Sequence, residues 1–243
     1  MRAQITTAAV MALARCTPYL ENEMLGLRDL IEPGSVCVDV GAAAGLYTLV
    51  MSQLAGPMGA VHSVEPLTFA RPVWSKVLAA RSAANVQHHA LALGAEPGTG
   101  VMSVPMGRFG AVTGRSFLTG GSYDLGSNAE FATHVSVDVP VSTLDCMCTD
   151  ACLPALDFIK IDTEGAELQV LRGGERAIKE FRPVILVEIE ARHAARYQCE
   201  PDDIVTWLAD RGYVMYAWRS GWRPAGQVSS DTRNYLFRPA AVS

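Results

Sequence analysis

The sequence predicts an α/β protein with a doubly wound, seven-stranded, mostly parallel sheet, preceded by an N-terminal helical segment. Three observations lead to this prediction. Short runs rich in Val and Ile alternate with stretches of helical periodicity, as they do when each buried strand is followed by a helix. The first run, residues 36–40, breaks into a turn of glycines and alanines and then resumes as a helix. Later runs end in acidic residues, which is typical of strands whose carboxyl ends face a ligand.

The length and composition fit a single domain of the soluble globular class. The chain has 243 residues, of which 49% are hydrophobic and 19% charged, and it contains no apolar run near the ~20 residues that a membrane span requires. The formal net charge is -5 and there is no basic block, so nucleic acid is a poor candidate partner. The six cysteines form no complete zinc-binding pattern and fit a reducing compartment, so we expect a cytoplasmic protein.

Residues 1–33 are expected to form a helical segment that acts as a lid or packing element ahead of the main domain, residues 34–243. Pro33 and Gly34 end its helical pattern. The first strand is followed by a helix from residue 46, a strand at 60–64, a helix at 69–84 and a strand within 85–94. Strands at 156–161, 183–190, 213–218 and 234–238, with a helix at 201–212, complete the expected order.

The turn after the first strand is the first candidate binding element. Gly41 and Gly45 allow backbone angles and a close approach that side chains would forbid. Glu65 ends the neighbouring second strand, where a carboxylate can accept hydrogen bonds from both hydroxyls of a ribose. Together they predict an adenosine-type ligand over the turn. The structural alternatives are a turn required only for packing and a carboxylate that caps the next helix.

Residues 96–134 differ in character from the rest of the chain. Gly, Ser, Thr, Met and Phe dominate, and helical periodicity disappears. A long irregular segment in a compact domain is often functional, so we expect a substrate-facing insertion whose aromatic residues line a pocket. The alternating strand that follows, at 135–141, is expected to pair with residues 101–104.

Acidic residues collect at the ends of two later strands. Asp162 and Glu188 close strands that we expect to be neighbours, and Glu164 follows in the first turn of a helix, where the helix dipole favours a negative charge. Two such carboxylates offer the oxygen ligands that suit magnesium better than zinc. The alternative is that these acids orient a substrate or Lys160.

Four motifs resemble one family. They are residues 38–45 (VDVGAAAG), 64–66 (VEP), 143–145 (TLD) and especially 158–167 (FIKIDTEGAE). Together they look like the FkbM family of O-methyltransferases, which modify hydroxyls on polyketides and saccharides. The resemblance covers roughly residues 34–190, and it implies the Rossmann-like class I methyltransferase fold with S-adenosylmethionine as the cofactor.

By this resemblance, Asp39 and Gly41 would border the amine and carboxylate of the cofactor's methionine part, in a turn that includes Ala42 and Gly45. Glu65 would hold the ribose, and Asp162 and Glu188 would face the substrate. Related metal-dependent enzymes place a cation between acids at these two strand ends and add a third acid directly after the second. That position is Ile189 here, so Glu164, Glu190 or His193 would complete a cation site.

The expected chemistry is an in-line methyl transfer to a hydroxyl, with Asp162 and Glu188 binding magnesium and a histidine taking the proton. His193 follows the fifth strand and His134 ends the insertion, so both are candidate bases. Two rival functions share the glycine turn: a nucleotide-sugar or NAD-binding Rossmann enzyme, and a non-catalytic cofactor-binding protein. The first lacks the G-x-G-x-x-G spacing here. The sequence leaves open whether the acceptor is a sugar or a polyketide and whether the chain forms a homo-oligomer.

Overall fold

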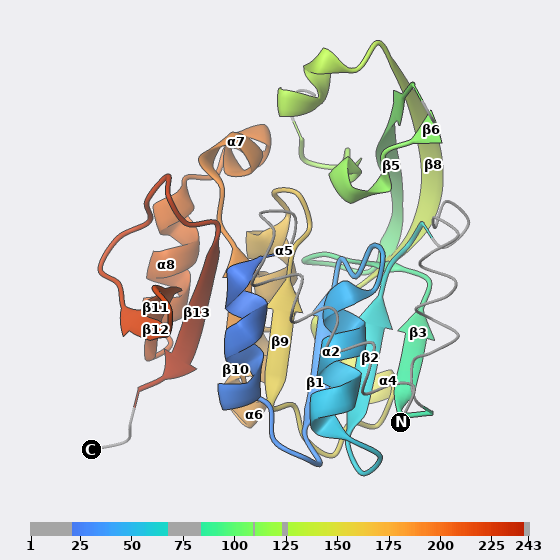
Figure 1. The fold of residues 1–243 in the computed structure, drawn as a ribbon. Helices are drawn as coiled ribbons and strands as arrows, with labels where there is room; N and C mark the ends of the chain where they lie inside the picture. The colour runs from blue at the N-terminus through green and yellow to red at the C-terminus, as the bar shows by residue number, and fades with distance from the viewer. Residues whose placement is uncertain (1–20, 68–83, 109, 123–125, 241–243) are drawn as a thin grey trace.

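The computed structural model describes residues 21–67, 84–108, 110–122 and 126–240. The predicted helical segment before residue 21 and the predicted helix at 69–84 therefore lie outside the described residues. Within the described part of the chain, the elements form a central sheet covered by helices on both faces and a second, smaller sheet (Figure 1). None of the helices in that part combines the length and apolar character needed to cross a bilayer.

The central sheet confirms the doubly wound α/β prediction but has eight strands, not seven, among the described residues. In spatial order they are β12 (Trp222–Pro224), β11 (Tyr213–Trp218), β13 (Asn234–Pro239), β10 (Val184–Glu188), β9 (Phe158–Ile161), β1 (Val36–Val40), β2 (Ala60–Val64) and β3 (Val86–His89). The unexpected member, β12, is a three-residue strand that pairs antiparallel with β11 at the sheet edge. β13 is antiparallel to both of its neighbours, while β10, β9, β1, β2 and β3 are parallel.

The central strands are apolar because both faces of the sheet are covered. All five residues of β1 and all four of β9 are buried. The chain runs outward from β1 through β2 to β3 and then returns to β9 on the other side of β1. This reversal leaves a crevice at the carboxyl ends of β1 and β9, the place where open α/β sheets bind their ligands.

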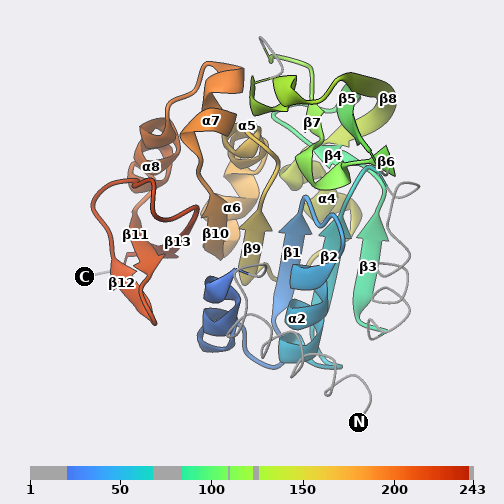
Figure 2. The same cartoon turned by 45° about the horizontal axis from the view of Figure 1, so that its top comes forward.

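Helices occupy both faces of the central sheet (Figure 2). One face packs against the 3₁₀ helix η1 (Asn22–Asp29) and α2 (Leu46–Ala55), with Met24, Leu27 and Leu49 in the core. The other packs against α4 (Leu144–Asp150), α5 (Glu167–Arg172), α6 (Glu175–Phe181) and α8 (Pro201–Ala209). The short elements α7 (Ala191–Ala194) and η5 (Ala195–Tyr197) follow β10.

The insertion at residues 96–134 forms much of a second sheet, so the expectation of an irregular segment is wrong. Its strands are β4 (Ala92–Leu93), β5 (Gly98–Gly107), β6 (Gly110–Ala111), β7 (Phe117–Leu118) and β8 (Thr133–Ser142), with η3 (Thr113–Arg115) and η4 (Gly126–Glu130) between them. The predicted pairing is confirmed, because Val101 lies opposite Asp138 and Val104 opposite Val135. Figure 1 shows the β5–β8 ribbon extending beyond the carboxyl edge of the central sheet.

The predicted strand at 85–94 is divided between the two sheets. β3 belongs to the central sheet, whereas β4 pairs with β8. The chain therefore passes from one sheet to the other within a few residues, and this step anchors the insertion beside the crevice.

Candidate functional site

The turn after β1 has the backbone shape that its glycines predict. Gly41, Ala43 and Gly45 all have positive φ angles, of 77°, 44° and 82°. A Cβ on Gly41 would lie 1.7 Å from the backbone oxygen of Asp162, so β1 and β9 approach too closely there for any side chain. A Cβ on Gly45 would meet no atom within 4 Å, so this side of the turn faces open space.

Glu65 holds the turn in place. Its Oε2 accepts a hydrogen bond from the Ala43 backbone N–H at 2.9 Å, and its Oε1 accepts one from the Leu67 N–H at 2.8 Å. The residue is buried directly after β2. The carboxylate therefore lies beside the turn, as predicted, with its oxygens fixed by backbone donors.

A cavity of about 670 Å³, the Glu65 pocket, opens on one side of the turn. Its lining includes Gly41, Ala43, Glu65, Pro66, Leu91, Leu93, Met102, Thr113, Ser116, Leu118, Asp162 and Glu164. The walls are mostly apolar, and Met102, Thr113, Ser116 and Leu118 come from the insertion. The insertion therefore borders the cavity beside Glu65.

A second cavity of about 620 Å³, the Lys160 pocket, opens on the other side of the turn. Its lining includes Glu21, Met24, Asp39, Gly41, Ala42, Ala43, Ala44, Leu46, Tyr47, Lys160 and Asp162. Gly41, Ala43 and Asp162 border both pockets, so an elongated molecule can lie across the turn with one end in each.

Asp39 is the buried carboxylate of the Lys160 pocket. The Thr48 hydroxyl donates a hydrogen bond to its Oδ2 at 2.5 Å. Burial raises the pKa of Asp39 to about 6, against the opposing effects of the Thr48 hydrogen bond and Lys160. A cation bound beside the Asp39 carboxylate would therefore be favourable, because it would stabilise the ionised form of this buried group.

Lys160 belongs to a network that also contains Asp162, Asn234 and Glu23. Its Nζ donates to Asn234 Oδ1 at 2.8 Å and lies 3.3 Å from Asp162 Oδ2, and Asn234 in turn donates to Glu23. Burial alone would lower the pKa of Lys160, but the Asp162, Glu21, Glu188 and Asp39 carboxylates together raise it above its ordinary value. This Lys160 network keeps the lysine charged and fixes the Asp162 carboxylate.

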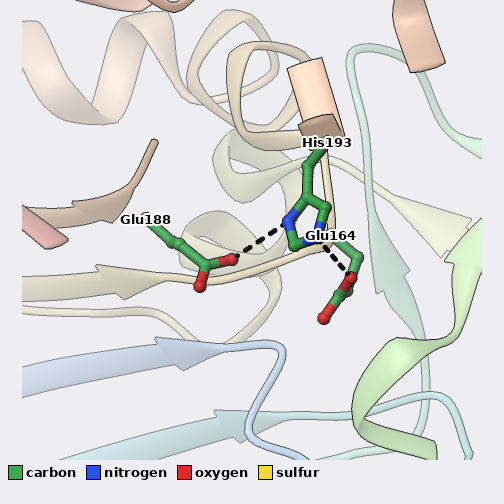
Figure 3. A group of neighbouring side chains, drawn as sticks. All are labelled: Glu164, Glu188 and His193. Carbon is green, nitrogen blue, oxygen red and sulfur yellow. Dashed lines mark ion pairs between the residues drawn. The ribbon is translucent and has the colours of Figure 1, made fainter. Parts of the chain in front are cut away.

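A second group of side chains lies at the ends of β9 and β10 (Figure 3). Glu188 ends β10, Glu164 lies in the loop after β9, and His193 lies on α7. The His193 Nε2 is 3.1 Å from Glu164 Oε2, and its Nδ1 is 3.4 Å from Glu188 Oε2. Burial raises the pKa of Glu164 to about 8 and of Glu188 to about 10, and lowers that of His193 to about 4.

The predicted metal ligands Asp162, Glu164 and Glu188 fall into two groups that share Glu188. One group is Glu164, Glu188 and His193, and the other is Glu21, Asp162 and Glu188. Within each group, one candidate ligand atom per residue lies within 4.8 Å of the others. Asp162 and Glu164 are thus not brought into the same group.

The two candidate bases lie in different places. His193 lies between two carboxylates, whereas His134 lies on β8, with its Nδ1 3.2 Å from Ser103 Oγ and its ring edge-on to Phe131. His134 lines neither pocket. Glu21 and Tyr47 line the Lys160 pocket without having been singled out from the sequence, because neither belongs to a recognisable motif.

Comparison with known proteins gives matches of three kinds. Residues 39–215 match the methyltransferase FkbM domain. The chain is 27% identical over 208 residues to the methyltransferase sdnD of Sordaria araneosa, which covers 77% of this chain and 76% of sdnD. Among solved structures, it is similar to the methyltransferase FkbM from Methylobacillus flagellatus KT, with 18% identity and a TM-score of 0.51.

The match to the M. flagellatus structure covers 89% of this chain, which spans half the length of that one. Cofactor-bound Rv0187 from MTB also has a TM-score of 0.51, at 14% identity, covering 98% of this chain and 89% of that one. At these identities both likenesses concern the fold, which is the Rossmann-like class I methyltransferase fold. The domain match covers more than half of the sequence, from Asp39 in β1 to Met215 in β11, and the chain therefore belongs to the FkbM family of methyltransferases.

Proposed function

We propose that this chain transfers a methyl group from S-adenosylmethionine to a hydroxyl of a small molecule, of saccharide or polyketide type. The observation that carries the proposal is the pair of pockets joined at the glycine turn, with the Glu65 carboxylate beside one and Asp39 in the other. S-adenosylmethionine has a nucleoside end, an amino-acid end and a cationic sulfur between them. The two pockets fit these parts in order.

The cofactor's nucleoside is assigned to the Glu65 pocket. The apolar side chains of Leu91, Leu93, Met102 and Leu118 suit the faces of a purine, and the Glu65 carboxylate suits the two ribose hydroxyls. Gly41, Ala42 and Gly45 offer backbone atoms at close range along the turn. The insertion at 96–134 then covers the nucleoside, and we propose that it also faces the acceptor.

The cofactor's amino-acid end is assigned to the Lys160 pocket, where charge separates it from the main rival. Glu21, Asp39 and Asp162 line this pocket, and its lysine is already paired with Asp162. The pyrophosphate of NAD or of a nucleotide sugar would face these three carboxylates and be repelled. The α-ammonium of a methionine part would be attracted by Asp39.

The acceptor hydroxyl is assigned to the space beside the acids that end β9 and β10. The hydroxyl oxygen forms a bond to the methyl carbon as the carbon–sulfur bond of the sulfonium breaks and S-adenosylhomocysteine leaves. The hydroxyl also loses its proton, so a group that accepts the proton or polarises the hydroxyl assists the step. We propose that a divalent cation at Glu188, with Asp162 or Glu164, supplies that assistance. His193 contacts both Glu164 and Glu188, so it either takes the proton or joins the cation's ligands. His134 contacts Ser103 and Phe131 instead.

Binding and turnover test the proposal separately. Calorimetry with S-adenosylhomocysteine and with NAD should show micromolar binding of the first and none of the second, and NAD binding alone would overturn the proposal. A labelled methyl-transfer screen over sugar and polyketide hydroxyls, with and without chelator, tests the acceptor class. S-adenosylhomocysteine binding with no transfer to any hydroxyl would favour a non-catalytic cofactor-binding protein.

A further inference from the structure

We infer that Glu164, Glu188 and His193 form a binding site for a divalent transition metal, with the imidazole as one ligand. The inference deepens the proposed function, because it names the cation class and gives His193 the role of a ligand. It rests on the proposed function only for what the metal does to the acceptor. The existence of the site rests on the side chains themselves.

Glu188 and His193 are buried, Glu164 is half-buried, and four polar atoms of the group lack hydrogen bonds. His193 is 3% exposed, and neither of its ring nitrogens has a hydrogen-bond partner among the described residues. The same holds for Glu164 Oε2 and Glu188 Oε2, the oxygens that face the ring. Buried polar atoms without partners are rare in native proteins, and an unbound ion is one of the few explanations.

One nitrogen of the imidazole can bind a cation. A neutral imidazole carries one N–H, so it can donate to one of the two carboxyl groups that flank it. Its other nitrogen then directs a lone pair at the second carboxyl group, and either a carboxyl proton or a metal ion between the two removes the repulsion. A metal ion there would leave the N–H to orient the ring on the other carboxylate, as metal-bound histidines commonly do.

The spacing matches that of adjacent ligands. Metal–nitrogen and metal–oxygen bonds of about 2.1 Å, at angles between a right angle and a tetrahedral one, place neighbouring ligand atoms roughly 3.0–3.4 Å apart. The distance from His193 Nε2 to Glu164 is 3.1 Å and that from Nδ1 to Glu188 is 3.4 Å, so a metal on either nitrogen has one carboxylate oxygen at this spacing, while the other carboxylate lies beside the second nitrogen. One candidate ligand atom of each residue lies within 4.8 Å of the others.

The other candidate group is less suited to a metal ion, because it already contacts the Lys160 ammonium. In the group of Glu21, Asp162 and Glu188, the Asp162 carboxylate already lies 3.3 Å from the Lys160 ammonium, which is 1% exposed. A metal ion at Asp162 would therefore be placed beside a fixed positive charge in a buried environment. In the other group, histidine nitrogens face the two carboxylates in place of a lysine.

The ligand types select the metal. Imidazole suits Mn²⁺, Fe²⁺, Co²⁺ and Zn²⁺, whereas Mg²⁺ prefers oxygen ligands alone and keeps several waters. Glu164 also lines the Glu65 pocket, so the site borders the cavity assigned to the cofactor. A metal held there would be within reach of an acceptor at the same edge of the sheet.

The test uses the full chain after treatment with EDTA and dialysis. Titration with Co²⁺, Mn²⁺ and Mg²⁺ is followed by calorimetry, and Co²⁺ is also followed by its visible absorption, which reports nitrogen coordination. We expect Co²⁺ and Mn²⁺ to bind at least tenfold more tightly than Mg²⁺. His193→Gln and Glu188→Gln should each weaken Co²⁺ binding by 10- to 100-fold, and His193→Gln should alter the absorption.

Glu175→Gln is the control. It removes an acid that belongs to neither group of candidate ligands and whose carboxylate is paired with Arg211, so Co²⁺ affinity should be unchanged. If Glu188→Gln fails to fold by circular dichroism, Glu164→Gln, at a less buried position, takes its place. Equal binding of Mg²⁺ and Co²⁺, or Co²⁺ binding unaffected by both ligand variants, would overturn the inference.

S-adenosylhomocysteine binding is measured on the same samples to separate the two proposals. Cofactor binding with no Co²⁺ or Mn²⁺ binding overturns the metal site and leaves the proposed function in place. Metal binding with no S-adenosylhomocysteine binding overturns the proposed function and leaves the site.

Discussion

At the scale of single residues, the site depends on carboxylates whose surroundings give them different tasks. Glu65 is held by two backbone donors, Asp39 by a hydroxyl, and Asp162 by a buried ammonium. Sequence reasoning could find all three, because each follows or lies within an apolar strand and strand ends converge at one edge of the sheet. It could not determine that Glu188 lies close to both Asp162 and Glu164 while these two fall into different groups, because that depends on where each side chain points beyond the end of its strand.

Glu65→Gln is predicted to weaken both the turn and cofactor binding. The amide can accept from one of the two backbone N–H groups, but its NH₂ opposes the other, at a cost of about 1–3 kcal/mol. We expect S-adenosylhomocysteine to bind on the order of ten- to a hundredfold more weakly by calorimetry. Glu96→Gln, at an exposed position, should bind as the unmodified chain does, and unchanged binding by Glu65→Gln would contradict the role of Glu65.

Asp39 should make cofactor binding depend on pH. Its pKa is raised to about 6 in the free protein, so it is ionised at pH 7 and protonated below pH 6. An α-ammonium attracts only the ionised form, so the affinity for S-adenosylhomocysteine should fall as the pH drops, by about tenfold one pH unit below the pKa. Calorimetry at pH 5 and pH 7 measures the change. The Asp39→Asn variant has no carboxylate at this position, so its affinity for S-adenosylhomocysteine should lose this dependence on pH. The same pH profile in the variant and the unmodified chain would rule out the pairing of Asp39 with the α-ammonium.

At the scale of elements, the turn between β1 and α2 contains two glycines that perform different tasks. Gly41 lets two strands approach, and Gly45 leaves space open at the start of α2. The sequence identifies both as turn glycines. The distinction between packing and ligand access requires the position of Asp162, which lies 121 residues further along the chain and cannot be placed by local pattern.

Substitution of these glycines by alanine should separate the two tasks. Both have positive φ, so each alanine costs about 1–2 kcal/mol in the backbone alone. Gly41→Ala adds a contact of 1.7 Å with the Asp162 oxygen, so it should lower the free energy of unfolding by roughly 3 kcal/mol or more, or prevent folding. Gly45→Ala should fold. Urea unfolding measures the difference, and equal losses in the two variants would contradict it.

The strands of the central sheet were predictable because burial on both faces requires continuous apolar runs. In the insertion, only the alternating centre of β8 and its pairing with residues 101–104 were predictable, because β6 and β7 have two residues each and display no periodicity. Its two long strands, β5 and β8, pair with each other, and Met102, Val104 and Val139 on them belong to a small core of their own. The extra strand β12 was missed for a related reason, since three residues are too few to display periodicity.

At the scale of the whole molecule, distant parts of the chain meet at the Lys160 pocket. Asn234 at the start of β13 contacts both Lys160 in β9 and Glu23 in η1. Trp222 donates from its Nε1 to the Gly26 oxygen at 3.3 Å, and a Cβ on Gly26 would lie 2.4 Å from the Trp218 ring. The first and last thirds of the described chain are thus joined by direct contacts.

Asn234→Ala is predicted to destabilise the whole fold through Lys160. The substitution leaves a buried ammonium without one of its acceptors, at a cost of about 2–4 kcal/mol. In a Lys160→Met background the same substitution should cost less, because no ammonium remains. A double-mutant cycle by urea unfolding measures this coupling, and strictly additive losses would show that the Asn234–Lys160 contact contributes nothing.

The position of Asn234 also bears on the order in which the protein becomes competent during synthesis. A chain leaves the ribosome from its N-terminus, and its early segments can begin to fold before the rest is made. The turn, Glu65 and the central parallel strands all precede residue 190, but the partner that holds Lys160 emerges more than 40 residues later. A nascent chain can therefore form the Glu65 side of the site well before the Lys160 side, whose network is complete only after residue 234 has emerged.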